Sequence, residues 1–155
     1  MLESLKTFFS ELTEGSRHPD RFGEDDHRLA AAALLVHAAT VDGSETAAER
    51  KTLHDLLKSR FALDEEATAE LIEKATAADR EAIDLYHFTR LINRQCDLDG
   101  RVRMIEMMWE IACADGRVTE FEDNLLWRVA DLLGVSSHER IALRQRVSER
   151  SAEGA

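Results

Sequence analysis

The chain has a single proline, Pro19, and only two cysteines among its 155 residues. After Pro19, therefore, no proline ring interrupts a helix or removes a backbone donor from it. Cys96 and Cys113 lack the paired spacing of a metal site, so we interpret them as reduced thiols of an intracellular protein. Aromatic and β-branched residues are few, whereas Ala, Leu, Glu and Arg are abundant, a composition that favours helices over strands.

Basic residues are also scarce, because 20 Lys and Arg against 31 Asp and Glu give a formal net charge of −11. Such an acidic surface repels phosphate backbones, so we expect no nucleic-acid partner and instead expect cations or basic protein surfaces. No apolar run is long enough to span a membrane. The opening MLESLKTFFSEL carries charges in every turn and lacks the apolar centre of a secretory leader. The sequence therefore predicts a cytoplasmic protein without membrane insertion.

The chain does contain an internal repeat. The segment ATVDGSETAAE at 39–49 is matched by ACADGRVTEFE at 112–122, which places Asp42 and Asp115 in equivalent positions. Both copies contain Asp-Gly followed by Thr-x-x-Glu, and apolar residues precede both at matching positions. Each copy of such a repeat is typically one supersecondary unit, which buries its apolar face against its neighbour.

Apolar residues recur at helical spacing along the chain, and no convincing strand pattern is present. We expect an all-α helical bundle of about eight helices, built from two pseudo-symmetric αα-hairpin repeats with antiparallel neighbours. The predicted organisation is an N-terminal amphipathic helix at 1–14, a loop at 15–25 and a helical domain at 26–150. Residues 77–84 are predicted to join two helices, and the last helix is predicted to end near Val147.

The repeat also predicts which side chains form the core. One set from the first copy should face a second set across a pseudo-twofold axis: Leu34, Leu35, Ala38, Leu53, Leu56 and Leu57 against Met107, Met108, Ile111, Leu126, Val129 and Leu133. Phe121 is predicted to belong to the buried stripe of the helix that begins at Glu120. Trp127 lies on the opposite side of that helix, where it would be either an interaction anchor or, as we prefer, covered by the first or last helix.

Three stretches resemble the TerB-like (tellurite-resistance) family: LAAAALLVHAATVDGSETAAE, DLYHFTRLIN and MMWEIACADGRVTEFEDNLLWRVADLLGVS. The resemblance covers roughly residues 24–147. A related domain stands at the front of a membrane-anchored J-domain co-chaperone. The resemblance implies an all-helical bundle with no established enzymatic activity. It also implies acidic positions suspected of binding divalent cations, and an association with membrane-linked stress responses.

The repeated Asp-Gly-x5-Glu motif also occurs in the second half of an EF-hand calcium loop. An EF-hand needs oxygen ligands four and two residues before this Asp. Those positions hold Ala38 and Thr40 in the first copy, and Ile111 and Cys113 in the second. These are poor calcium ligands, and the spacing of apolar residues predicts that a helix continues through these positions. We therefore reject the EF-hand for both copies.

Two interpretations of the motif remain. In the first, Thr46 with Glu49 and Thr119 with Glu122 form capping boxes, in which the threonine and the glutamate each bond the other's backbone amide. The glycine of each motif would then end the preceding helix with a positive φ angle. On this interpretation every residue of the motif has a role in forming the turn, and no ligand is needed.

In the second interpretation, pseudo-symmetry brings Asp42, Glu49, Asp115 and Glu122 around one acidic pocket. Carboxylates gathered in this way repel one another unless a cation or protons compensate their charge. The cation would be Ca²⁺ or Mg²⁺, because the motif offers oxygen ligands rather than thiolate or imidazole. Further oxygen ligands are available from Glu45, Asp99 and Glu120. His37 lies near the first loop, where it would either orient a metal ligand or simply form part of a helix flank.

The chain has no nucleophile elbow, no glycine-rich phosphate loop and no histidine pair with zinc spacing, so we predict that it is not an enzyme. The predicted function is a non-enzymatic intracellular module that binds a protein partner and a divalent cation. By resemblance it is linked to stress and tellurite resistance. The alternatives are a purely structural interaction domain whose loops are helix caps and, more remotely, a metal-assisted hydrolase that uses the paired carboxylates.

Overall fold

The computed structural model describes residues 22–41, 43, 45–114, 116 and 118–153. Every regular element in this part of the chain is an α-helix, which confirms the all-α prediction. The helices are α2 (His27–Thr40), α3 (Ala47–Arg60), α4 (Glu65–Glu81), α5 (Tyr86–Gln95), α6 (Leu98–Ala112), α7 (Glu120–Leu132) and α8 (Ser137–Glu153). The helix predicted at 1–14 lies outside the described residues.

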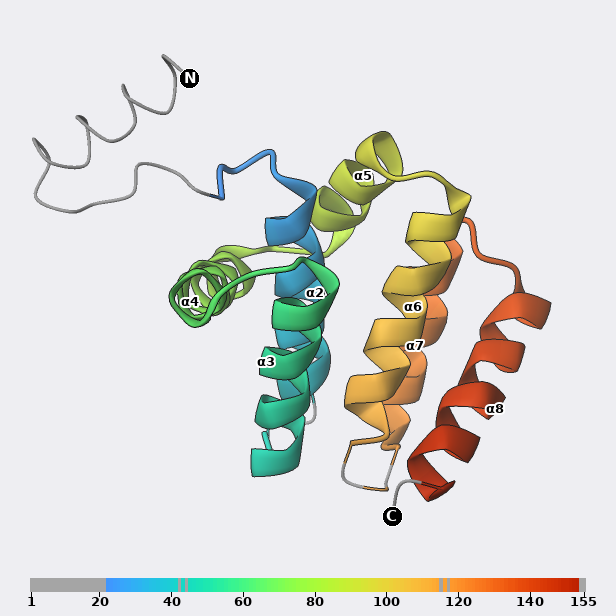
Figure 1. Ribbon diagram of the computed structural model, residues 1–155. Coiled ribbons are helices and arrows are strands. Elements are labelled where there is room, and N and C mark those ends of the chain that lie inside the picture. The colour runs from blue at the N-terminus through green and yellow to red at the C-terminus, as the bar shows by residue number, and fades with distance from the viewer. Residues whose placement is uncertain (1–21, 42, 44, 115, 117, 154–155) are drawn as a thin grey trace, which may run out of the picture.

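Helix α2 forms the centre of the bundle. Nine of its 14 residues are buried, and they occupy nearly all sides of the helix rather than one stripe. A helix that is apolar all round is stable only when other elements surround it. Helices α3, α4, α5 and α6 pack around α2, and α7 contacts it more lightly (Figure 1). Six alanines in α2 leave room for these neighbours to approach closely.

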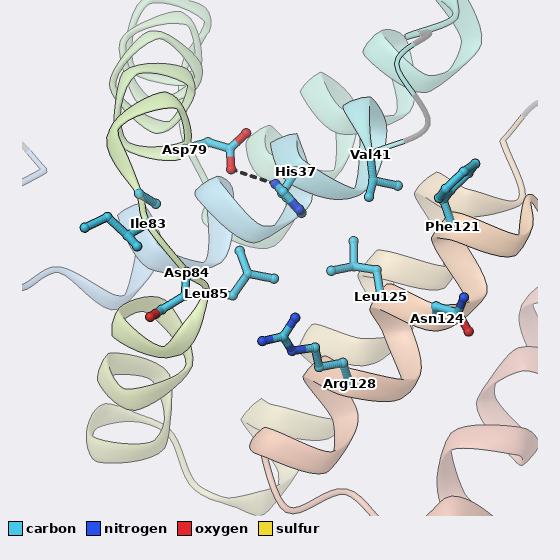
Figure 2. Close-up of a pocket in the computed structure, with 11 residues that line it drawn as sticks. His37, Val41, Asp79, Ile83, Asp84, Leu85, Phe121, Asn124, Leu125 and Arg128 are labelled. Atoms are coloured by element: carbon cyan, nitrogen blue, oxygen red, sulfur yellow. Dashed lines mark hydrogen bonds and ion pairs between the residues drawn. The ribbon is translucent and has the colours of Figure 1, made fainter.

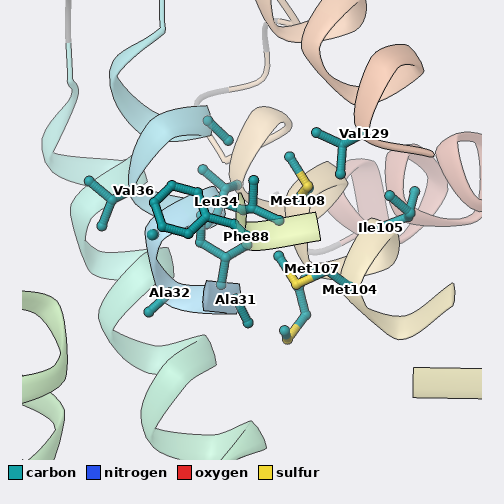
Figure 3. Close-up of a cluster of buried hydrophobic side chains, with 14 of the residues drawn as sticks. Ala31, Ala32, Leu34, Val36, Phe88, Met104, Ile105, Met107, Met108 and Val129 are labelled. Carbon is teal, nitrogen blue, oxygen red and sulfur yellow. The ribbon is translucent and has the colours of Figure 1, made fainter. Parts of the chain in front are cut away.

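The predicted core joins the two copies of the repeat. Eleven of the twelve residues predicted to face one another are buried, and Leu56 is half-buried. Figure 3 shows Leu34 of α2 beside Met107 and Met108 of α6, with Val129 of α7 at the upper right of the same cluster. Helices α2 and α3 both pack against α6, so the first hairpin lies against the second as the repeat predicts.

Helix α8 covers the outer side of the second hairpin. It packs against α6 and α7, and Arg144 places its guanidinium carbon 5.3 Å from the centre of the Trp109 ring. Trp109 is fully buried in α6. None of the described helices combines the length and apolar character that crossing a lipid bilayer requires.

The helix start predicted at Glu120 is confirmed, and two predicted helix ends are corrected. Asp26 and Asp64 cap α2 and α4, and each accepts a hydrogen bond from a first-turn backbone amide. Helix α4 continues to Glu81, so the junction predicted at 77–84 is much shorter, because alanine-rich sequence there favours helix. Helix α8 continues past Val147 to Glu153, since no breaker intervenes and Arg150 bonds a glutamate of α6.

Candidate functional site

The two Asp-Gly turns form the same capping box. In the first, Thr46 Oγ1 accepts the Glu49 amide at 3.1 Å, and Glu49 Oε1 accepts the Thr46 amide at 3.1 Å. In the second, the corresponding distances between Thr119 and Glu122 are 3.1 and 3.0 Å. The glycines have φ angles of +82° at position 43 and +81° at position 116, the left-handed region that ends a helix. The predicted capping boxes and left-handed glycines are therefore confirmed in both copies.

Both capping glutamates are buried, with exposed fractions of 3% for Glu49 and 2% for Glu122. Burial of a carboxylate is unfavourable unless it is hydrogen-bonded, and the capping box supplies bonds to one oxygen of each. The turns lie at the same end of the bundle, where α2 and α6 end and α3 and α7 begin (Figure 1). The repeat therefore brings these helix ends together.

The predicted metal site also requires Asp42 and Asp115, which lie outside the described residues. The structure therefore places two of the four predicted ligands, Glu49 and Glu122, at the same end of the bundle. Within the described part, which leaves out both aspartates, no three His, Cys, Asp or Glu side chains are grouped to hold a metal ion. Convergence of all four carboxylates stays a prediction.

A pocket of about 350 Å³ opens beside the turns, between the end of α2, the α4–α5 junction and the start of α7 (Figure 2). Its residues are His37, Val41, Asp79, Ala82, Ile83, Asp84, Leu85, Phe121, Asn124, Leu125 and Arg128. Val41, Leu85 and Leu125 point into its centre, and Ile83 and Phe121 lie on its rim. Because Val41 and Phe121 adjoin the two motifs in sequence, the pocket lies next to both turns.

Polar groups line opposite sides of this pocket. The His37 ring nitrogen Nδ1 forms a hydrogen bond of 2.8 Å with Asp79 Oδ1, which ties α2 to α4 (Figure 2). Arg128 extends from α7 on the other side and makes no hydrogen bond or ion pair within the described part of the chain. The sequence suggested that His37 was near the first loop but could not identify Asp79, which is 42 residues away.

Two aromatic residues of α7 are more exposed than the sequence predicts. Phe121, expected in the buried stripe, is 62% exposed, and Trp127, expected under another helix, is 55% exposed. Phe121 lies in the first turn of α7, beside the end of α2 at Val41, where no described helix continues over it (Figure 2). Helix α8 packs against α7 but leaves Trp127 exposed. Both predictions of burial are wrong.

The pocket has the chemistry of a binding site rather than of a recognisable catalytic site. Its described lining contains a His-Asp pair but no serine, threonine, cysteine or lysine that could act as a nucleophile. An apolar floor with a few polar groups at the edge is typical of pockets that accept an apolar group and orient it. Ile83, fully exposed at the rim, and Phe121 extend the apolar surface beyond the pocket.

A family model described as "Tellurite resistance protein TerB" matches residues 28–145. The match covers more than half of the chain, from α2 into α8, and includes both turns and the pocket beside them. It confirms the resemblance read from the three sequence stretches. No curated protein and no solved structure is similar enough to this chain to be matched.

Proposed function

The chain belongs to the TerB family of tellurite resistance proteins, and we propose that it is a non-enzymatic module that binds a protein partner at the pocket beside its turns. The observation that carries the proposal is the pocket rim, where Ile83 is fully exposed and Phe121 is largely so. These apolar side chains border a concave apolar floor in a protein whose net charge is −11. Exposed apolar surface next to a pocket is typical of protein-interaction sites.

The charge of the chain suggests the chemistry of the partner. We expect an apolar segment flanked by basic residues, because long-range attraction to an acidic protein speeds the encounter with such a partner. One apolar side chain would fill the pocket against Val41, Leu85 and Leu125. Burying it fully would contribute about 1.5–3 kcal/mol. Ile83 and Phe121 would then exclude water around it.

The proposal is tested by photo-crosslinking in cells exposed to tellurite. A photoreactive residue at position 83 or 121 should crosslink to the same protein, and one at Ile141, an exposed site on α8, should not. The partner identified in this way is then titrated with the purified chain. Ile83→Asp and Phe121→Asp should weaken binding at least tenfold, as loss of an interface anchor does, whereas Ile141→Asp should leave it unchanged. Equal weakening by all three variants would contradict the proposal.

A role in tellurite resistance predicts a matching phenotype. Cells that depend on this chain for growth on tellurite should lose that growth with Phe121→Asp and keep it with Ile141→Asp, provided both variants accumulate to wild-type levels. If Phe121→Asp did not affect growth on tellurite, the pocket would not be needed for tellurite resistance. The cytoplasmic location and the resemblance to a J-domain co-chaperone both stay predictions.

A second proposal is that the two turns together bind Ca²⁺ or Mg²⁺. It is supported by the placement of both turns at one end of the bundle and by the burial of Glu49 and Glu122 there. These carboxylates with those of Asp42 and Asp115 would supply the oxygen ligands that a hard cation prefers. The purely structural alternative, in which the turns are only caps, accounts for the described hydrogen bonds equally well. Metal-assisted hydrolysis stays the remote alternative.

Differential scanning calorimetry separates these alternatives. Millimolar Ca²⁺ or Mg²⁺ should raise the melting temperature at pH 7, because a ligand that binds only the folded state stabilises it. The rise should be smaller at pH 4, where protons compete for the same oxygens. The double change Asp42→Asn with Asp115→Asn should abolish the rise, and Asp131→Asn on the exposed face of α7 should not. A melting temperature that does not respond to either cation would leave the capping boxes as the whole explanation.

A further inference from the structure

A second pocket, of about 300 Å³, lies where α2 and α6 begin and α3 and α5 end. Figure 1 shows these helix ends together at the end of the bundle opposite the two turns. The pocket is lined by His27, Ala31, Arg60, Phe61, Ile92, Cys96, Gly100, Arg103, Met104 and Met107. Four separate helices thus enclose one small cavity.

The charge of this pocket is opposite to that of the chain. Its lining includes two arginines and a histidine but no aspartate or glutamate, although the chain as a whole has a net charge of −11. Arg60 is partly compensated, because its guanidinium lies 3.7 Å from both Glu106 and Glu110. Arg103 is exposed and makes no hydrogen bond or ion pair within the described residues. Its guanidinium is therefore available to an anion from solution.

The floor of the pocket is apolar and adaptable. Ile92, Met104 and Met107 are buried members of the core that also line this cavity. Methionine is unbranched and polarizable, so a pair of methionines can adjust to the shape of an apolar group placed against them. Phe61 adds an aromatic wall from the end of α3.

We propose that this pocket binds a small amphiphilic anion, whose carboxylate lies against Arg103 and whose apolar chain lies on Met104 and Met107. The guanidinium presents several N–H donors in a planar fork that matches a carboxylate. An apolar chain without a charge would leave Arg103 unused, and a cation would be repelled by it. The apolar floor in turn disfavours a fully polar anion such as inorganic phosphate.

Cys96 provides a direct way to observe binding, because it lines the pocket and is half-buried. Burial raises the pKa of the Cys96 thiol, and the neighbouring charge of Asp97 raises it further. Alkylation by N-ethylmaleimide is therefore best followed at about pH 8.5, where more of the reactive thiolate is present. The only other cysteine, Cys113, is buried and serves as an internal reference in the mass spectrum.

The probe is octanoate, a short apolar chain that ends in a carboxylate. It should slow the alkylation of Cys96 in a saturable way, with a dissociation constant of about 0.1–1 mM, as expected for a ligand of this size. Octan-1-ol and octylammonium should protect much less at equal concentration. Isothermal titration of the unalkylated protein should give the same dissociation constant for octanoate.

Two arginine variants test the assignment. Arg103→Gln should weaken octanoate binding about threefold to tenfold, the loss expected from removing a charge-assisted hydrogen bond at a partly exposed site. Arg90→Gln, which removes an exposed arginine of α5 outside the pocket, should leave the binding unchanged. Absence of saturable protection, equal protection by octylammonium, or equal weakening by both variants would overturn the proposal. The opposite end of the bundle is untouched, so this result is independent of the partner-binding test.

Discussion

The two Asp-Gly turns have nearly the same local geometry, but the helices that meet at them are buried to different extents. In the first hairpin α2 is almost wholly inside the bundle, whereas α3 buries only Leu53, Leu57 and its capping glutamate. In the second hairpin α6 and α7 share the burial more evenly. The motif therefore determines the turn, and the neighbouring helices determine how deeply each side of it is buried.

One pair of equivalent positions shows this difference clearly. Val36 of α2 corresponds to Trp109 of α6, and both side chains are buried. Around Val36 the bundle leaves room for a small side chain, since helices pack closely on α2. Trp109 instead fills the larger space between α6 and α8, under the guanidinium of Arg144. Helix α4 follows the first hairpin and packs against α2, as α8 follows the second hairpin and packs against α6, so the same position accepts very different volumes within similar arrangements of three helices.

The largest expected effect comes from truncating this pair. Trp109→Ala should lower the free energy of unfolding by about 3–5 kcal/mol, because it leaves a large cavity beneath α8. Val36→Ala removes far fewer buried atoms and should cost about 1–2 kcal/mol. Urea denaturation of both variants measures the difference. Equal losses would contradict the unequal packing of the two hairpins.

Substituting the glycines of the turns should have equal effects in the two copies. Gly43→Ala and Gly116→Ala should each cost about 1–2 kcal/mol, since both positions have a positive φ and no described atom would clash with an added Cβ. Gly23→Ala is the control, because its Cβ would also meet open space and its φ is not in the left-handed region. It should change stability by less than about 0.5 kcal/mol. A clearly larger cost at one turn than at the other would show that the turns differ.

The capping hydrogen bonds should also contribute equally. Thr46→Ala and Thr119→Ala should each lower the free energy of unfolding by about 0.5–2 kcal/mol, the usual loss of a helix N-cap. Thermal unfolding followed by circular dichroism measures both variants. Serine at either position keeps the hydroxyl acceptor and should restore most of the stability. If neither alanine variant lost stability, the capping hydrogen bonds would not contribute to the stability of the turns.

The smallest effect is expected at Glu110, which belongs to the second hairpin alone. Burial raises the pKa of the Glu110 carboxyl, and Glu106 adds to this, although Arg60 and Arg150 oppose it. The folded state therefore retains this proton more tightly, so stability is greatest below the unfolded pKa and falls as pH rises through the folded pKa. Glu110→Gln removes the ionisation. It should raise the melting temperature at pH 7 by a few degrees at most and have less effect near pH 4.

The matched control for Glu110 is Glu106→Gln. Glu106 accepts a hydrogen bond of 3.0 Å from Arg150, so losing its charge should not raise the melting temperature at pH 7. One oxygen of Glu110, in contrast, is buried without a hydrogen-bond partner among the described residues. A lower melting temperature for Glu110→Gln at pH 7 would show that its ion pairs with Arg60 and Arg150 outweigh its burial.

Sequence reasoning predicted the fold well and the surface poorly. The all-α class, the repeat, the capping boxes and the left-handed glycines are all confirmed. These features depend on periodicity and on contacts within a few residues, which the sequence displays directly. The exposure of Phe121 and Trp127 was predicted wrongly, because it depends on where the distant helices α2 and α8 lie. The convergence of the four acidic residues on a cation stays untested.

Neither pocket could have been found in the sequence, for the same physical reason. The pair of His37 and Asp79 joins residues 42 positions apart, and the pocket around Arg103 collects the ends of four helices. The sequence by itself determined the two repeated turns, with the helices that end and begin at them, because caps, glycines and apolar spacing act over one or two turns. Only the tertiary structure decided which side chains share a cavity or stay exposed, because helix packing brings together residues that have no local relation.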